Sequence, residues 1–333
     1  MAHTFYHEVE ANTHAALGYK LGNLFGELTR ADVAEAGAQR DWKHKVSASR
    51  RLLKKTEQYF PHYVEELNAY ADAAGIPLLE LWALSVEDEL DEAGREKCTT
   101  VVTNGGKLIS HNEDWDEDAD EAICILRKTL AGTTLFEIYY SAVPLGGCAI
   151  SINSNGYLQA INSLTQSDRQ IGVPRNVIAR WLSETRDVPA DFEALKAIPR
   201  SSGYNHVFVN SQGEAFDMEC TATRQVLARP SLPYVHTNHY LSSELEGYDG
   251  AEKGDGTFKR YVAACRLMTA RMTVSELITL SSDETGGRRT SILNQDTIGR
   301  MVVDLENHIV KVWLRREKKD GWIDYPLDFL SSP

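Results

Sequence analysis

Residues 96–116 read EKCTTVVTNGGKLISHNEDWD, which is one cysteine followed by the pattern of a β-hairpin. The run Thr99–Thr103 contains only Thr and Val, and such β-branched residues favour a pleated strand. Residues 104–106 (NGG) predict a tight turn, because Asn and Gly adopt positive φ at low cost. Residues 107–111 then return as the second strand of the hairpin.

The length of the turn decides which residue comes back to Cys98. A two-residue loop at Gly105-Gly106 places Cys98 opposite Glu113, whereas a three-residue loop places it opposite Asn112. Either register brings residues 112–114 beside the cysteine. A thiol at the first residue of a strand, next to a carboxylate, suggests a nucleophile.

The composition of the 333-residue chain excludes several classes of protein. A net charge of −13 argues against nucleic acid and against anionic membrane surfaces, which both require a basic patch. Five widely spaced cysteines without CxxC pairs favour a reduced compartment over a disulfide framework. The N-terminus shows no secretory pattern, and no apolar run is long enough to span a membrane, so we expect a cytoplasmic protein.

The periodicity of apolar residues changes at Cys98. The first 97 residues predict a helical prefix that ends in a charged linker, Asp91–Lys97. Beyond it we expect strands at 99–103, 107–111, 122–128, 135–142, 147–153, 157–162, 205–210, 214–219, 224–227, 234–238, 298–305 and 308–314, with helices at 176–185, 190–197, 257–270 and 273–280. Two antiparallel sheets covered by helices on both outer sides, a four-layer αββα sandwich of the α+β class, satisfy this order. Composition alone leaves other α+β arrangements open.

A cysteine nucleophile needs a base, because a free thiol has a pKa of about 8.5. Cutting the Lys97–Cys98 bond would release an α-amine with a pKa of roughly 7.7–8.0 on the same residue. An N-terminal nucleophile therefore carries its own base.

Several motifs together resemble one enzyme family. Residues 98–102 (CTTVV), the Asn-Gly turn, residues 112–115 (NEDW), the helical segment 75–84 and residues 237–240 (TNHY) are similar to N-terminal-nucleophile hydrolases of the acyl-coenzyme A:6-aminopenicillanate acyltransferase type, peptidase family C45. Penicillin V acylase and bile salt hydrolase are more distant relatives. The resemblance implies autocatalytic cleavage before Cys98. It divides the chain into a segment 1–97, a propeptide or small subunit, and a catalytic segment 98–333, which together form one globular unit. Lys97 departs from the small residue that the family often carries before the cysteine.

The resemblance also implies catalytic residues. Asp114 matches the aspartate of the Asn-x-Asp motif and would orient the released amine, with Asp116 in reserve. Asn238 ends a strand before a loop, where its amide can stabilise the oxyanion of acyl transfer.

Further positions complete the predicted site. Asn162 resembles a second oxyanion or substrate-binding asparagine. Arg260, in the segment 257–261 (TFKRY), resembles the arginine of the family's Ser-x-x-Arg helix start and could pair with Asp114. His111 and Asn112, just ahead of Asp114, are candidate positioning or substrate-binding residues.

The sequence predicts neither a metal nor an organic cofactor. The acidic residues 114–121 fail the EF-hand template, which needs Gly where Ala119 stands and Glu where Ile125 stands. His236 and His239 lack a clear third ligand for zinc.

These features predict an autoprocessing cysteine amidohydrolase or acyltransferase for a small N-acylated amine or amide. The pattern at 111–114 looks similar to the insect N-β-alanyl-dopamine hydrolase branch. Acyl-coenzyme A would be a substrate of a transferase variant. A non-processing binding protein on the same fold is the alternative that Lys97 favours. The chain is a possible homo-oligomer.

Overall fold

The computed structural model describes residues 4–91, 98–115, 121, 123–251, 255–317 and 321–330. Its strands are β1 (Tyr6–Ala11), β2 (Thr99–Thr103), β3 (Leu108–Asp114), β4 (Ile123–Leu130), β5 (Thr133–Tyr140), β6 (Ile150–Asn153), β7 (Tyr157–Ser163), β8 (Tyr204–Asn210), β9 (Ala215–Cys220), β10 (Gln225–Ala228), β11 (Tyr234–His236), β12 (Thr297–Asp304), β13 (Ile309–Leu314) and β14 (Ile323–Pro326). Its helices are α1 (His14–Gly37), α2 (Trp42–Tyr59), α3 (Pro61–Ala74), α4 (Leu78–Ser85), α5 (Glu87–Leu90), α6 (Arg175–Leu182), α7 (Val188–Leu195), α8 (Gly256–Leu267) and α9 (Val274–Ser281).

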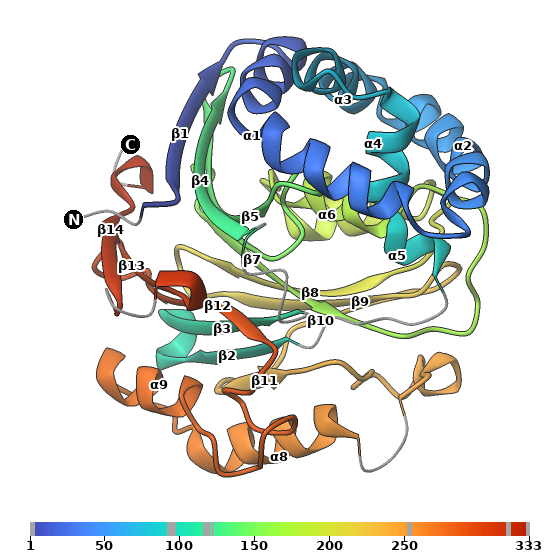
Figure 1. Ribbon diagram of the computed structural model, residues 1–333. Coiled ribbons are helices and arrows are strands. Elements are labelled where there is room, and N and C mark those ends of the chain that lie inside the picture. Colours follow the sequence, from blue (N-terminus) through green and yellow to red (C-terminus); the bar gives the residue numbers. More distant parts are fainter. Residues whose placement is uncertain are drawn as a thin grey trace.

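The strands form two stacked sheets between two layers of helices (Figure 1). One sheet has eight strands in the order β1-β4-β5-β6-β7-β8-β9-β10, and the other has six in the order β11-β2-β3-β12-β13-β14. Helices α1 to α4 and α6 lie over the eight-stranded sheet, while α8 packs on β2 and β11, and α9 packs on β3 and β12. The predicted four-layer αββα sandwich is confirmed.

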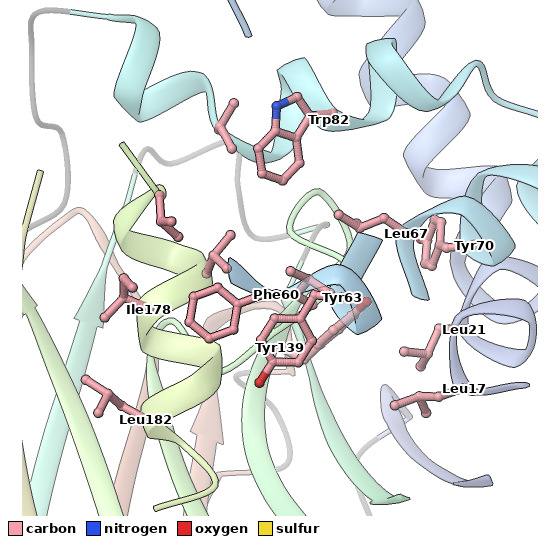
Figure 2. Close-up of a cluster of buried hydrophobic side chains, with 14 of the residues drawn as sticks. Leu17, Leu21, Phe60, Tyr63, Leu67, Tyr70, Trp82, Tyr139, Ile178 and Leu182 are labelled. Carbon is pink, nitrogen blue, oxygen red and sulfur yellow. The ribbon is translucent and has the colours of Figure 1, made fainter. Parts of the chain in front are cut away.

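Three apolar clusters hold these layers together. One lies between the helices of the prefix, α6 and the outer face of the eight-stranded sheet, where Figure 2 shows Phe60, Tyr63 and Tyr139 together, and Leu17 and Leu21 farther along the same cluster. A second fills the space between the sheets, and a third lies under α8 and α9. Each fully buried aliphatic side chain contributes about 1.5–3 kcal/mol, so every layer is fixed by its own core.

The prefix is not entirely helical, which corrects one prediction. Residues 6–11 (YHEVEA) form β1, which pairs in parallel with β4 from Tyr6 opposite Ile125 to Ala11 opposite Leu130. The strand carries polar residues on its exposed side, and its partner lies far away in sequence, so local periodicity did not reveal it. The short edge strand β14 was also missed.

Close packing of α1 on α3 ties the prefix together. Gly22 lies so near α3 that a Cβ atom there would come within 2.4 Å of the Tyr70 carbonyl oxygen. Glycine is therefore required for this helix approach. Among the described helices, none combines the length and apolar composition that a membrane crossing requires.

Candidate active site

The opening hairpin has the register of the two-residue loop. Thr99 pairs with Asn112 and Thr103 pairs with Leu108, so Cys98, just before β2, comes opposite Glu113. Asn104, with φ of 53°, and the two glycines of the turn all have positive φ, as the NGG pattern predicts.

Strand alternation divides the residues of this hairpin between two faces of the six-stranded sheet. Thr100 bonds Asn162 of β7, so this face looks into the space between the sheets. Thr99 accepts a hydrogen bond from Arg260 of α8, so the other face looks toward the helices. Because side chains alternate along a strand, Glu113 lies on the face of Thr100 and Asp114 lies on the face of Thr99.

A buried carboxylate contacts the thiol. Cys98 Sγ lies 3.7 Å from Glu113 Oε2, and the same oxygen lies 2.8 Å from His111 Nε2. Tyr140 OH donates to Glu113 Oε1 over 2.7 Å. All four side chains are nearly inaccessible to solvent. The Sγ, imidazole and carboxylate atoms of this cluster lie within 4.8 Å of one another, a donor set that zinc can accept.

The backbone of Cys98 is held by two side chains from distant segments. Its N–H donates to Asn238 Oδ1 over 2.9 Å, and its carbonyl accepts from Arg260 Nη1 over 2.6 Å. Arg260 also donates to Asn238 Oδ1 over 2.7 Å and to Thr99 Oγ1 over 2.9 Å. Burial lowers the pKa of the Arg260 guanidinium, while the charges of Asp114 and Cys98 oppose that shift. Three sequence-predicted residues, Cys98, Asn238 and Arg260, therefore meet in one hydrogen-bonded group.

Asp114 lies on the opposite face from the thiol. Thr297 Oγ1 and Asn294 Nδ2 donate to its carboxylate over 2.6 Å and 2.7 Å. Burial raises the pKa of Asp114 to about 6, against the lowering effect of the Arg260 charge and of these two hydrogen bonds. Arg260 thus links Asp114 and Cys98 electrostatically, and the role of Asp114 toward a released amine stays a prediction.

The remaining predicted residues divide between the two faces. Asn162 Oδ1 accepts from Thr100 Oγ1 over 3.0 Å, and Thr100 in turn bonds His111 Nδ1 over 3.0 Å, so Asn162 and His111 belong to the thiol side. Asn112 uses its amide nitrogen to bind the carbonyls of Ser281 and Ile292, both over 2.9 Å. Its side chain anchors the α9 layer and points away from Cys98. Lys97 and Asp116 lie outside the described residues.

Sequence reasoning did not assign Glu113, Thr100 and Tyr140 to the site. The two-residue register already put Glu113 opposite Cys98, and alternation put it on the same face. Tyr140 comes from β5 of the other sheet, a contact that no local pattern predicts. The histidines considered for zinc have other partners: His236 Nε2 lies 3.0 Å from Glu219 Oε1, and His239 Nδ1 lies 3.0 Å from Thr257 Oγ1.

Residues 101–322 match the family model for acyl-coenzyme A:6-aminopenicillanic acid acyl-transferase. The chain belongs to this family. The match begins just after Cys98 and includes Asp114, Asn162, Asn238 and Arg260, so the predicted family resemblance is confirmed.

Individual proteins extend the comparison. The chain is 24% identical over 213 residues to the beta-alanyl-dopamine/carcinine hydrolase of Drosophila melanogaster, and it spans about half (55%) of the length of that relative. A mutant of the conjugated bile acid hydrolase of Clostridium perfringens superimposes with a TM-score of 0.45 at 12% identity, covering 70% of this chain and 92% of its own. Penicillin V acylase of Agrobacterium tumefaciens gives a TM-score of 0.38 at 12% identity, covering 67% and 77%.

Proposed function

We propose that the protein is a cysteine N-terminal-nucleophile amide hydrolase or acyltransferase that acts on a small N-acylated amine. The observation that carries the proposal is the environment of Cys98. Its N–H binds Asn238, its carbonyl binds Arg260, and its thiol contacts a carboxylate. A strand-initial cysteine held at its backbone nitrogen and carbonyl has the geometry that a nucleophile with a reactive terminal amine requires.

In the proposed reaction, the released α-amine of Cys98 takes the thiol proton and the thiolate forms an S–C bond with the substrate amide carbonyl. The C–N bond then breaks as that proton passes to the leaving amine, and water or a second amine takes the acyl group from sulfur. Asn238 is suited to stabilise the oxyanion. Its Nδ2 carries two hydrogens, of which one donates to the Ser163 carbonyl over 2.9 Å, so the second can serve the substrate. An amide donor of this kind accelerates acyl transfer by about 10²–10³. Asn162, next to Thr100 between the sheets, is the second proposed donor.

Cleavage between Lys97 and Cys98 is part of the proposal. Cys98 is only 2% exposed, so a substrate cannot reach the thiol in the uncut chain. We propose that the cut opens the site and releases the α-amine beside Asn238 and Arg260. Segment 1–97 would then remain bound as a small subunit, because β1 is a strand of the eight-stranded sheet and α1 to α4 share a core with it.

The substrate class follows from the relatives. The similarity to beta-alanyl-dopamine/carcinine hydrolase favours hydrolysis of a small N-acyl amine. The family name favours transfer from acyl-coenzyme A, which is the second candidate. All five cysteines lie in the described part of the chain, and none forms a disulfide, which supports a cytoplasmic location.

Mass spectrometry of the purified protein tests the proposal. We expect two fragments, the larger beginning at Cys98, and a single uncut chain for Cys98→Ala. A panel of N-acyl amines, with and without acyl-coenzyme A or an added amine acceptor, then separates hydrolase from transferase. A chain that stays intact at 37.2 kDa and behaves like Cys98→Ala would favour the non-processing binding protein instead.

A further inference from the structure

The thiol of the uncut chain needs a base other than its own nitrogen. Before cleavage the Cys98 nitrogen belongs to a peptide bond and donates its only hydrogen to Asn238 Oδ1. An amide nitrogen does not accept a proton at neutral pH. The first proton transfer of the proposed self-cleavage must therefore use a different group.

Glu113 is placed to accept that proton. Its Oε2 lies 3.7 Å from Cys98 Sγ, within the range of a sulfur hydrogen bond. Tyr140 OH donates to the other oxygen, Oε1, and leaves Oε2 to the thiol and to His111. A carboxylate in this position is a candidate general base on grounds of geometry alone.

His111 is held beside the same carboxylate oxygen by its own hydrogen bonds. Thr100 Oγ1 donates its single hydrogen to Asn162 Oδ1, because Asn162 Nδ2 points to the His236 carbonyl. Thr100 Oγ1 also lies 3.0 Å from His111 Nδ1, so the imidazole ring is held at both of its nitrogens. His111 Nε2 lies 2.8 Å from Glu113 Oε2, a distance at which a hydrogen lies between the two atoms, so His111 positions Glu113 and takes no further proton from it.

We propose that Glu113, positioned by His111, is the general base that deprotonates Cys98 for cleavage of the uncut chain. The S–H bond breaks and the proton binds Glu113 Oε2. The thiolate forms an S–C bond with the carbonyl of residue 97. Collapse of this adduct breaks the C–N bond, and the Cys98 nitrogen recovers the proton as it leaves as an amine. Water then hydrolyses the thioester.

Charges from every side of the thiol agree with this assignment. His111 and Tyr140 face Glu113 from the space between the sheets. From the helix side, the cationic Arg260 binds the Cys98 carbonyl and favours a thiolate, while Asp114 partly offsets that charge. The inference rests on the proposed function, because it assigns the base for the same nucleophile.

The test measures self-cleavage of full-length chains during cell-free synthesis, by intact mass. Glu113→Gln keeps the shape and the Tyr140 contact but cannot accept the proton, so we expect cleavage to slow by about 100-fold or more. Glu113→Asp retains a carboxylate and should recover part of the rate. Glu137→Gln, which alters an equally buried carboxylate paired with Lys128 on β4, is the control for removal of a buried charge.

Hydroxylamine distinguishes failure of the thiol attack from failure of thioester hydrolysis. It cleaves a thioester once formed, so it should not restore cleavage of Glu113→Gln, in which the thiol attack itself fails. Cleavage of Glu113→Gln at the unmodified rate, or its rescue by hydroxylamine, would overturn the proposal and leave the cysteine mechanism intact. If Glu113→Gln does not fold, His111→Asn, which removes the contact that positions Glu113 Oε2, decides by the same criteria. A Cys98→Ala chain that still cleaves would instead refute the proposed function.

Discussion

Asp114 carries a stability cost that a single substitution should remove. Burial raises its pKa from 3.8 to about 6, so the folded chain holds this carboxyl protonated where the unfolded chain does not. Between about pH 4 and pH 6, folding takes up a proton, and stability therefore falls as pH rises through that window. Each pKa unit corresponds to 1.36 kcal/mol, so the full cost at pH 7 is about 3 kcal/mol.

Asp114→Asn removes the charge and keeps the shape. Thr297 can still donate to the amide oxygen, whereas the amide nitrogen meets the Asn294 donor and loses one hydrogen bond, at about 1 kcal/mol. We therefore expect Asp114→Asn to be about 2 kcal/mol more stable than the unmodified chain at pH 7 and slightly less stable near pH 4. Amide turnover should fall at the same time, as in other trade-offs between stability and activity.

Urea unfolding at several pH values, monitored by tryptophan fluorescence, measures this difference. Cys98→Ala in both backgrounds keeps all the chains uncut, so that cleavage does not alter the transition. Asp72→Asn, at an exposed carboxylate of α3, reports the effect of losing one surface charge. Equal destabilisation by Asp114→Asn at pH 4 and at pH 7 would refute the reasoning, because the pKa of Asp114 would then be the same in the folded and the unfolded chain.

Three other outcomes follow from the geometry. Asn238→Ala should lower turnover by about 10²–10³, measured as initial rate on the best N-acyl amine, and a loss below tenfold would contradict the oxyanion role. Gly22→Ala should destabilise the chain by about 1–3 kcal/mol in thermal melts, because its Cβ would overlap Tyr70, while Gly37→Ala, whose nearest contact would be 3.9 Å away, should not. Zinc ions should inhibit amide turnover by binding the thiol, imidazole and carboxylate around Cys98, and a chelator should restore the activity. Turnover that zinc does not change would show that the ion does not bind these side chains.

The hairpin could be predicted because its information is local. The NGG pattern predicts the turn and two possible registers, and the structure has the one that places Glu113 opposite Cys98. The helical layers also follow from periodicity, since each helix buries one apolar stripe. Strand β1 escaped prediction because its partner β4 lies more than a hundred residues away and its own pattern is largely polar.

The faces of the strand explain why the site was predicted only in part. The resemblance pointed to Asp114, and the structure puts that residue with Arg260 on the helix side, whereas the thiol lies with Glu113 between the sheets. Neighbouring residues in a strand point to opposite faces. A motif that contains both Glu113 and Asp114 therefore does not determine which of them contacts the thiol of Cys98.

Cys98 is the residue at which the two faces meet. Its side chain points to Glu113, while its backbone nitrogen binds Asn238 and its carbonyl binds Arg260. In the uncut chain only the first of these contacts offers a base. Once the bond to Lys97 is broken, the nitrogen becomes an amine on the Asn238 and Arg260 side, and a second base becomes available. The same cysteine can therefore use one base to cut the chain and another to turn over a substrate, and the separate effects of Glu113→Gln and Asp114→Asn on these two reactions measure that division.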